Sequence, residues 1–384
     1  MTVYDDLVGQ GSVIEQLDAA ARAGAEALAG GGGGGMTHAW LFTGPPGSGR
    51  SVAARAFAAA LLCPDLGCGH CASCHQVLSG THADIEVVRP AGLSYGVRET
   101  RQLVLRAASS PTGGRWRIVL FEDADRSTEQ AANALLKAIE EPAARTVWLL
   151  CAPSPDDLVI TIRSRCRLVT LRTPSSDAVA DVLVRRDGID PVVAADAARA
   201  AQGHIGRAKR LATDEEARRR RSEVLAMPGR LTALGSAVEA AASLVRAAEA
   251  ESKATGAARD VGETAALRQA LGENAKGRMP RGTAGALKEL EDRQKSRATR
   301  TKRDALDRAL LDLASYYRDV LVVQLGAGVE LVNADRAREV RSAGGSPEAT
   351  LRRLEAIMVC RERLEANVNP QLAVEAMAMA LRTG

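Results

Sequence analysis

A glycine-rich loop that follows an apolar run constrains this sequence most. Residues 38–43 read HAWLFT, as a buried strand would, and the loop GPPGSGRS at residues 44–51 leads directly into an alanine-rich stretch. Gly44, Gly47 and Gly49 allow backbone N–H groups to curl around an anion, and the start of the following helix adds a partial positive charge. This strand–loop–helix pattern is typical of a phosphate-binding P-loop and predicts an α/β fold.

Two residues of the loop leave its chemistry open. Ser51 is placed to ligate Mg²⁺, but Arg50 stands where a P-loop usually carries lysine. The planar guanidinium of arginine is bulkier than the compact ammonium of lysine and is not an equivalent replacement. The loop either binds a nucleotide with altered geometry or persists as a fold element that holds no productive ATP. Arg50 favours the second interpretation, which makes ATP and Mg²⁺ doubtful ligands of this pocket.

A pair of acidic residues points the same way. Glu122 and Asp123 end the apolar run at residues 118–121. ATPases place an aspartate here to hold Mg²⁺ and a glutamate after it to orient water, whereas this sequence has the two in reverse order. Since misplacing a reacting group by about 1 Å can cost on the order of a hundredfold in rate, we expect weak or absent hydrolysis. The alternative is a solvated acidic cap at a strand end.

Strand-like apolar runs recur along the first part of the chain. They occupy residues 38–43, 85–88, 118–121, 147–151 and 168–171, with helical patterns between most of them. This alternation predicts a parallel sheet that is covered by helices on both faces.

The strand signal ends at Pro174, and this sets the predicted domain boundaries. We predict an α/β domain at residues 1–174, a small helical domain at residues 175–228 and a helical C-terminal domain at residues 229–384. Residues 250–305 are rich in Ala, Glu, Lys and Arg and contain few large apolar side chains. They are either a solvated helical extension or a partly disordered insert.

A cluster of cysteines has the spacing of a metal site. The pattern is C-x4-C-x2-C-x2-C, formed by Cys63, Cys68, Cys71 and Cys74. Tight turns at C-x2-C pairs point both sulfurs inward, as tetrahedral Zn²⁺ requires, so we predict a structural zinc site with no open position for catalysis. His70 and His75 are alternative ligands, and free or redox-active thiols are the alternative to zinc.

Bulk composition excludes little. The 51 Lys and Arg against 47 Asp and Glu give a formal net charge of +4, which fits a mixed surface or a basic stripe on DNA. The strongest basic run, at residues 218–221, is either a solvated helix face or part of a zinc-containing DNA-binding module. No signal-peptide pattern or apolar run of about 18 residues occurs, so we expect no membrane contact and a cytoplasmic protein.

Several motifs together resemble one protein family. They are VGQ at residues 8–10, HAWLFTGPPG at 38–47, the cysteine cluster, NALLKAIEEP at 133–142 and TIRSRC at 161–166. In this order they resemble the AAA+ subunits of the bacterial DNA polymerase III clamp loader. Arg50 and the Glu122–Asp123 order are more similar to the delta-prime type than to the ATP-hydrolysing gamma/tau type. The resemblance covers residues 4 to about 225 and resumes near residues 364–372.

The composition also indicates which group of bacteria the resemblance points to. The glycine run at residues 30–35, which we interpret as a flexible surface loop, and the Ala/Arg-rich composition resemble actinobacterial members.

The resemblance implies a fold and roles for particular residues. The chain would combine an AAA+ RecA-like parallel sheet, a zinc-binding insertion, a small helical lid and an all-α collar. Arg165 would be an arginine finger that enters the ATP site of an adjacent subunit, with Ser164 and Cys166 setting its backbone. Arg207 matches the nucleotide-sensing arginine of the lid.

The resemblance also implies partners. The chain would join gamma/tau and delta subunits in a hetero-pentamer and reach the sliding clamp and primer–template DNA through that complex, in a nucleoid-associated replisome. It would act as a stator with little or no ATPase activity of its own, within the DNA polymerase III holoenzyme, a DNA-directed DNA polymerase (nucleotidyltransferase). The alternative is a gamma/tau-like subunit that itself binds and hydrolyses ATP.

Overall fold

The computed structural model describes residues 2–31, 34–90, 92–272, 280 and 283–384. They divide into two compact units, Met1–Thr213 and Asp214–Gly384. Parts of the glycine loop predicted at residues 30–35 and of the insert predicted at 250–305 lie outside the described residues.

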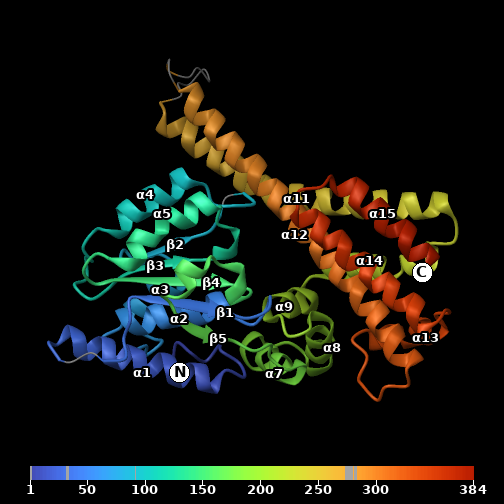
Figure 1. The fold of residues 1–384 in the computed structure, drawn as a ribbon, viewed down its shortest axis with the longest axis horizontal. Coiled ribbons are helices and arrows are strands. Elements are labelled where there is room, and N and C mark those ends of the chain that lie inside the picture. Colours follow the sequence, from blue (N-terminus) through green and yellow to red (C-terminus); the bar gives the residue numbers. More distant parts are fainter. Residues whose placement is uncertain (1, 32–33, 91, 273–279, 281–282) are drawn as a thin grey trace. The chain divides into compact units, whose positions relative to one another are not determined.

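A parallel sheet forms the centre of the first unit (Figure 1). The strands are β1 Ala39–Thr43, β2 Ile85–Val88, β3 Arg117–Phe121, β4 Thr146–Ala152 and β5 Arg167–Thr170. Their order across the sheet is β2-β3-β4-β1-β5, and each neighbouring pair is parallel. All of the predicted strands are therefore confirmed. Because parallel strands end at the same edge, the segments after β1 and β3 meet there.

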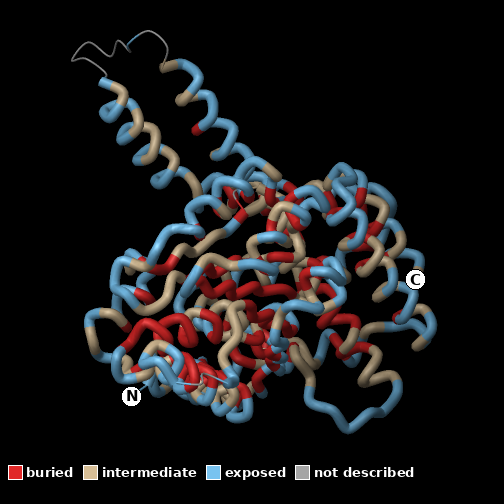
Figure 2. The backbone as a smooth tube through the Cα atoms, turned by 60° about the vertical axis from the view of Figure 1, so that its left-hand side comes forward, coloured by how far each residue is buried: buried red, intermediate tan, exposed pale blue. Residues whose placement is uncertain are grey.

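Two apolar cores cover the two faces of this sheet (Figure 2). Side chains alternate along β1, so Trp40 and Phe42 pack on one face and Leu41 on the other. The first face packs against α1 and α2, and the second against α4, α5 and α6. The helices of this layer and their neighbour α3 are α1 Gly11–Leu28, α2 Arg50–Leu62, α3 Ala72–Ser79, α4 Val97–Ala107, α5 Glu129–Glu140 and α6 Ile160–Arg163.

A small helical bundle follows the sheet within the first unit. Its helices are α7 Ser176–Asp187, α8 Pro191–Ala201 and α9 Ile205–Thr213. They enclose a separate core that includes Val179, Leu183 and Ala198. The parallel sheet, the loop after β1, this bundle and the helical second unit confirm the predicted AAA+ fold class.

The second unit contains helices and no strand among its described residues. The helices are α10 Glu215–Leu225, α11 Leu234–Ala270, α12 Ala284–Gln324, α13 Ala337–Ser342, α14 Pro347–Glu365 and α15 Pro370–Thr383. The predicted insert lies in the paired helices α11 and α12, as a helical extension over its described residues. Charged groups join the two helices, since Arg297 bonds Asp260 and Glu263 and Ser252 donates to the Ala298 carbonyl.

The observed division lies earlier in the chain than our predicted boundary at residue 228. Helix α10, which we placed in the lid domain, belongs to the second unit. Leu225 packs in the core of that unit, and Arg221 bonds the buried side chains of Asp312 and Asn333. The division into three functional domains stays a prediction.

Candidate functional site

The P-loop has the backbone that its glycines permit. Gly44 adopts φ 148°, and a Cβ there would lie 2.5 Å from the Leu171 carbonyl oxygen. Gly49 adopts φ 91° and precedes the first residue of α2. A Cβ at Gly47 would lie 2.6 Å from the Cβ of His204, so the helical bundle contacts the loop at this point. A side chain at any of these glycines would strain or displace the loop.

Arg50 bonds the loop itself. Its Nη1 donates to the Gly44 carbonyl oxygen at 2.6 Å, across the turn of the loop. Ser51 lies beside Cys151, a thiol whose pKa burial raises and the Ser51 hydroxyl lowers by a smaller amount. The cation that would reach a bound phosphate is therefore engaged by its own backbone.

Glu122 forms ion pairs with two arginines. Its carboxylate lies 3.2 Å from Arg55 of α2 and 2.7 Å from Arg89, which follows β2. Only 11% of the Glu122 side chain is exposed. The bond to Glu122 raises the pKa of Arg89. The carboxylate at the position of an ATPase's Mg²⁺ ligand is thus neutralised by two guanidinium groups from its own chain.

The chain turns sharply after Glu122. Asp123 adopts φ 51°, in the left-handed region. Burial, and then the charge of Asp123, raise the pKa of Asp125. Tyr95 stacks on Phe121 and donates to the carbonyls of Val88 and Glu122, which fixes the end of β3.

A buried amide joins the loop to the start of the helical bundle. The Gln10 Nε2 group donates to the Arg172 carbonyl at 2.6 Å and to the Ser48 carbonyl at 3.5 Å. On the bundle side, the Arg207 backbone N–H donates to His204 Nδ1 at 3.3 Å. The nucleotide-sensing role of Arg207 stays a prediction.

Arg165 lies at the surface after α6. Its Nη1 donates to the Thr161 carbonyl at 2.8 Å and to Ser164 Oγ at 3.3 Å, and its Nη2 lies 2.6 Å from Glu140 Oε1. The exposed fractions are 39% for the Arg165 side chain and 42% for Glu140. Cys166 packs inward, and burial raises the pKa of its thiol to about 12. The guanidinium is therefore partly exposed, and its two terminal nitrogens are held by different partners.

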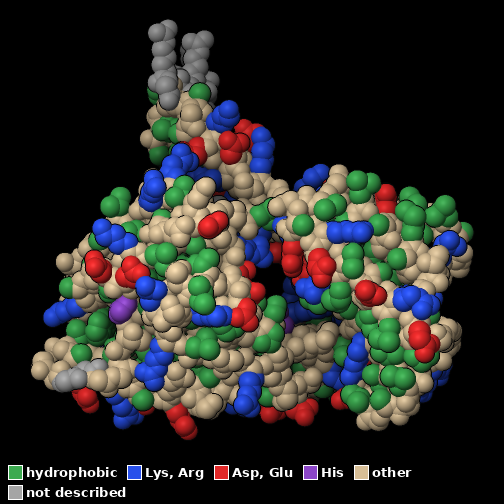
Figure 3. All heavy atoms as spheres, in the orientation of Figure 1, with side chains coloured by type: hydrophobic (Ala, Val, Ile, Leu, Met, Phe, Trp, Pro, Cys, Tyr) green, Lys and Arg blue, Asp and Glu red, His purple; other side chains and the backbone are tan. Residues whose placement is uncertain are grey.

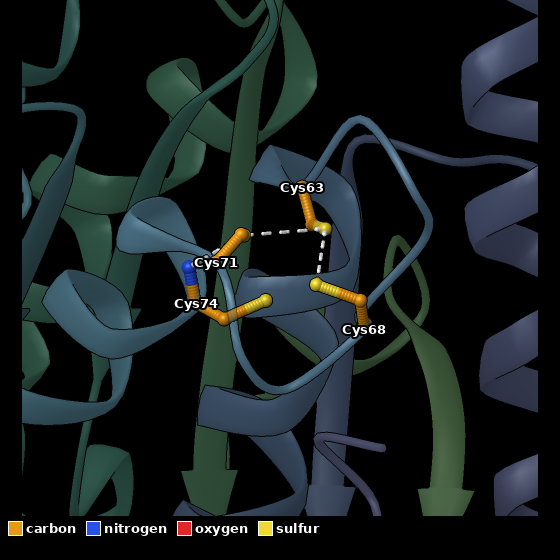
Figure 4. Close-up of side chains that lie close together, drawn as sticks. All are labelled: Cys63, Cys68, Cys71 and Cys74. Carbon is orange, nitrogen blue, oxygen red and sulfur yellow. Dashed lines mark hydrogen bonds between the residues drawn. The ribbon is translucent and has the colours of Figure 1, made fainter. Parts of the chain in front are cut away.

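The cysteine sulfurs converge on one point (Figure 4). All four lie within 4.8 Å of one another, and Cys63 Sγ lies 3.7 Å from those of Cys68 and Cys71. Zn–S bonds of about 2.3 Å in a tetrahedron put sulfurs about 3.8 Å apart. The cluster comes from the end of α2, the following loop and the start of α3. The cysteine geometry therefore fits zinc.

The surroundings of the cluster affect its cysteines differently, since they favour the thiolate form of Cys63 but not that of Cys74. Burial alone would raise the pKa of Cys63, but hydrogen bonds from backbone groups of Cys68, Gly67 and Asp65 lower it to about 7. Burial raises the pKa of Cys74 instead. A bound cation would favour the deprotonated form of every thiol.

Comparison with known proteins finds relatives of the α/β part of the chain. Residues 32–175 match the family described as DNA polymerase III, delta subunit. The chain is 38% identical over 155 residues to the DNA polymerase III subunit delta' of Pseudomonas aeruginosa, and 34% identical over 157 residues to that of Bacillus subtilis. These matches cover 38% and 40% of this chain.

Over its α/β part, the chain is therefore similar to delta-prime subunits of DNA polymerase III. It is also 34% identical over 167 residues to the DNA polymerase III subunit gamma/tau of Mycobacterium bovis, a match that covers 42% of this chain and 27% of that protein. The chain spans about half the length of the delta-prime relatives that it matches, 47% in each case.

The ion pairs of the basic run argue against the alternative of a zinc-containing DNA-binding module. In the basic run at residues 218–221, Arg219 and Arg220 pair with Glu216, and Arg221 pairs with Asp312. Figure 3 shows basic and acidic side chains mixed on the visible face. Among the described residues, no helix is long and apolar enough to cross a membrane.

The sequence analysis missed Arg55 and Arg89, and it included Glu140 only as part of the motif at residues 133–142, without a role. Apart from Arg50, Arg55 is the one charged residue of α2, which is otherwise mostly alanine and large apolar residues. A lone charge in a buried helix needs a partner, and that signal could have found it. Arg89 carries no comparable signal, since arginine is common on solvated surfaces. The motif at residues 133–142 contains Glu140 but does not indicate its partner.

Proposed function

We propose that this chain is a delta-prime-like stator of the clamp loader, which supplies Arg165 to the ATP site of a neighbouring subunit. Gamma/tau and delta subunits would complete the hetero-pentamer. Through that complex the chain would help to load the sliding clamp onto primed DNA at the replisome. Its own pocket would hold no productive nucleotide.

One contrast carries this proposal. The charged groups of the chain's own pocket are engaged within the chain, since Arg50 bonds Gly44 and Glu122 bonds Arg55 and Arg89. Arg165 is also bonded within the chain, but its carboxylate partner Glu140 is 42% exposed, whereas Glu122 is 11% exposed. An arginine finger acts by stabilising the charge of the transferring phosphoryl group, and it contributes about 10³–10⁵ in rate.

Zinc would be a structural ligand in this function. Cys63 directly follows α2, which begins at the P-loop, so a metal at the cysteine cluster would fix the far end of that helix. Four thiolates complete the tetrahedral shell and leave no position for a reacting group. Ser164 and Cys166 would hold the finger from either side.

The gamma/tau similarity supports a second candidate, a subunit that hydrolyses ATP itself. The two candidates differ in the isolated chain. A hydrolysing subunit should bind ATP with micromolar affinity and turn it over, whereas the stator should do neither. Filter binding with labelled ATP, with a gamma/tau subunit as the positive control, measures this difference.

The finger is tested by Arg165→Ala in the reconstituted loader. We expect the variant to assemble normally and to slow single-turnover hydrolysis at one ATP site by about 10³-fold or more. The neighbouring Arg163→Ala is the matched control, because Arg163 pairs with Asp156 instead. Unchanged turnover in an intact Arg165→Ala assembly would refute the finger.

A further inference from the structure

Glu140 contacts the arginine that the proposed function sends to a neighbouring subunit. It is the last residue of α5, and its Oε1 lies 2.6 Å from Arg165 Nη2. The other contacts of Arg165, to Thr161 and Ser164, are made by Nη1. The Nε edge of the guanidinium makes no hydrogen bond within the part of the chain that the structure describes. Glu140 is therefore the one charged group that holds the tip of the side chain.

The position of Glu140 favours a cation beside it. A carboxylate in the last turn of a helix lies at the negative end of the helix dipole, which disfavours it. Lys137 is the basic residue that α5 carries in the same last turn. Pairing with Arg165 relieves this unfavourable position. The pair therefore forms readily in the isolated chain.

The same pair exchanges easily, because both side chains are about two-fifths exposed. Exposed ion pairs contribute little to stability, since water solvates both partners when they separate. A triphosphate carries more negative charge than one carboxylate, and its oxygens accept the arginine fork in a bidentate manner. A nucleotide at the subunit edge would thus take Arg165 from Glu140.

We infer that Glu140 is the resting partner of Arg165, a positioning residue that keeps the finger folded on its own subunit until a neighbouring triphosphate replaces the carboxylate. This inference rests on the proposed finger function. While the pair persists, its net charge is zero and it attracts a triphosphate weakly. Glu140 therefore competes with the nucleotide, and the loader engages its finger only against that competition.

Glu140→Gln removes the charge and keeps the shape of the side chain. In the reconstituted loader we expect kcat/KM for ATP to rise about two- to fivefold, the range that an exposed ion pair can supply. Glu140→Asp retains the carboxylate and should stay near the wild type. Glu141→Gln is the matched control, since Glu141 is exposed and has no recorded bond to Arg165.

The outcomes separate this inference from the proposed function. In an Arg165→Ala background, Glu140→Gln should have no further effect on kcat/KM. If Arg165→Ala slows hydrolysis but Glu140→Gln leaves kcat/KM unchanged or lowers it, the resting-partner inference fails and the finger stands. If Arg165→Ala itself changes nothing, the proposed function fails. Raising salt should shrink the gain of Glu140→Gln, because screening weakens the pair in the wild type.

Discussion

Two arginine–glutamate clusters of the first unit differ in how they are buried. At the end of β3, Glu122 is 11% exposed and holds both Arg55 and Arg89. After α6, Arg165 and Glu140 are each about two-fifths exposed and form a single pair. The same two residue types therefore form a buried cluster of two cations and one carboxylate in the pocket, and a single exposed pair at the edge.

This difference shows that burial decides how easily the two partners of an ion pair can separate. If Glu122 turned to a metal ion, Arg55 and Arg89 would lose the carboxylate that they share, and this loss makes the release costly. An exposed pair that opens is solvated at once. On the proposed function, the buried cluster would keep Glu122 from a metal ion in the chain's own pocket, while Arg165 could leave Glu140 for a neighbouring ATP site.

The largest effect on this contrast should come from removing the zinc site next to helix α2, which carries one arginine of the buried cluster. Helix α2 carries Arg55 and ends at Leu62, directly before Cys63 of the cysteine cluster. Structural zinc in small modules contributes on the order of 10 kcal/mol of apparent binding energy. We expect about one zinc per chain by atomic absorption, and a fall in Tm of more than about 10 °C after chelation or in Cys74→Ala.

Cys360→Ala is the control for the zinc experiment. Cys360 is buried in the core of the second unit, away from the cysteine cluster in sequence. Its variant should lose some stability through a small cavity yet respond to a chelator as the wild type does. A metal-free protein with an unchanged Tm would count against the zinc site.

The next largest effect should come from the buried carboxylate itself. Glu122→Gln leaves two guanidinium groups without a charged partner, and we expect the free energy of unfolding to fall by about 2 kcal/mol. The value is below that of a fully buried pair because Arg89 is 58% exposed. Glu140→Gln should cost less than about 1 kcal/mol. Equal losses in urea denaturation would break the contrast.

Much of this site could be predicted from the sequence, because its signals are local. The loop after β1, the cysteine spacing and the apolar strands each depend on residues close together in the chain. The prediction of a metal site is supported by sulfurs that converge within 4.8 Å. The packing of helix α10 could not be predicted, because the apolar position of Leu225 predicts burial without specifying which helices cover it.

The pairing of Glu122 could not be predicted in the same way. Arg55 and Arg89 lie 67 and 33 residues from it in the chain. Their meeting depends on β2 lying beside β3 and on α2 covering the sheet. No pattern along the sequence specifies which arginine a given carboxylate will meet across such distances.

A smaller effect is expected when the pocket is partly freed. Arg50→Lys restores the usual P-loop cation, and Arg89→Ala removes one guanidinium from Glu122. Together they should strengthen Mg²⁺–ATP binding by about tenfold over the wild type, equivalent to about 1.4 kcal/mol. Isothermal titration calorimetry with each single variant as control measures the gain. If neither the double nor the single variants bind more tightly, the arginines are not what keeps the pocket idle.

The smallest expected effect separates the two clusters by their response to salt. Added salt screens exposed charges over a Debye length of about 10 Å at 0.1 M and about 3 Å at 1 M, and it reaches buried pairs far less. The stability lost in Glu140→Gln, already below about 1 kcal/mol, should therefore vanish near 1 M salt. The loss in Glu122→Gln should largely remain, because water and ions have little access to a side chain that is 11% exposed. Urea denaturation of both variants and the wild type at low and high salt measures the two differences directly. Parallel losses at every salt concentration would show that burial does not distinguish the pocket from the edge, and the proposal of an idle pocket and a free finger would lose this support.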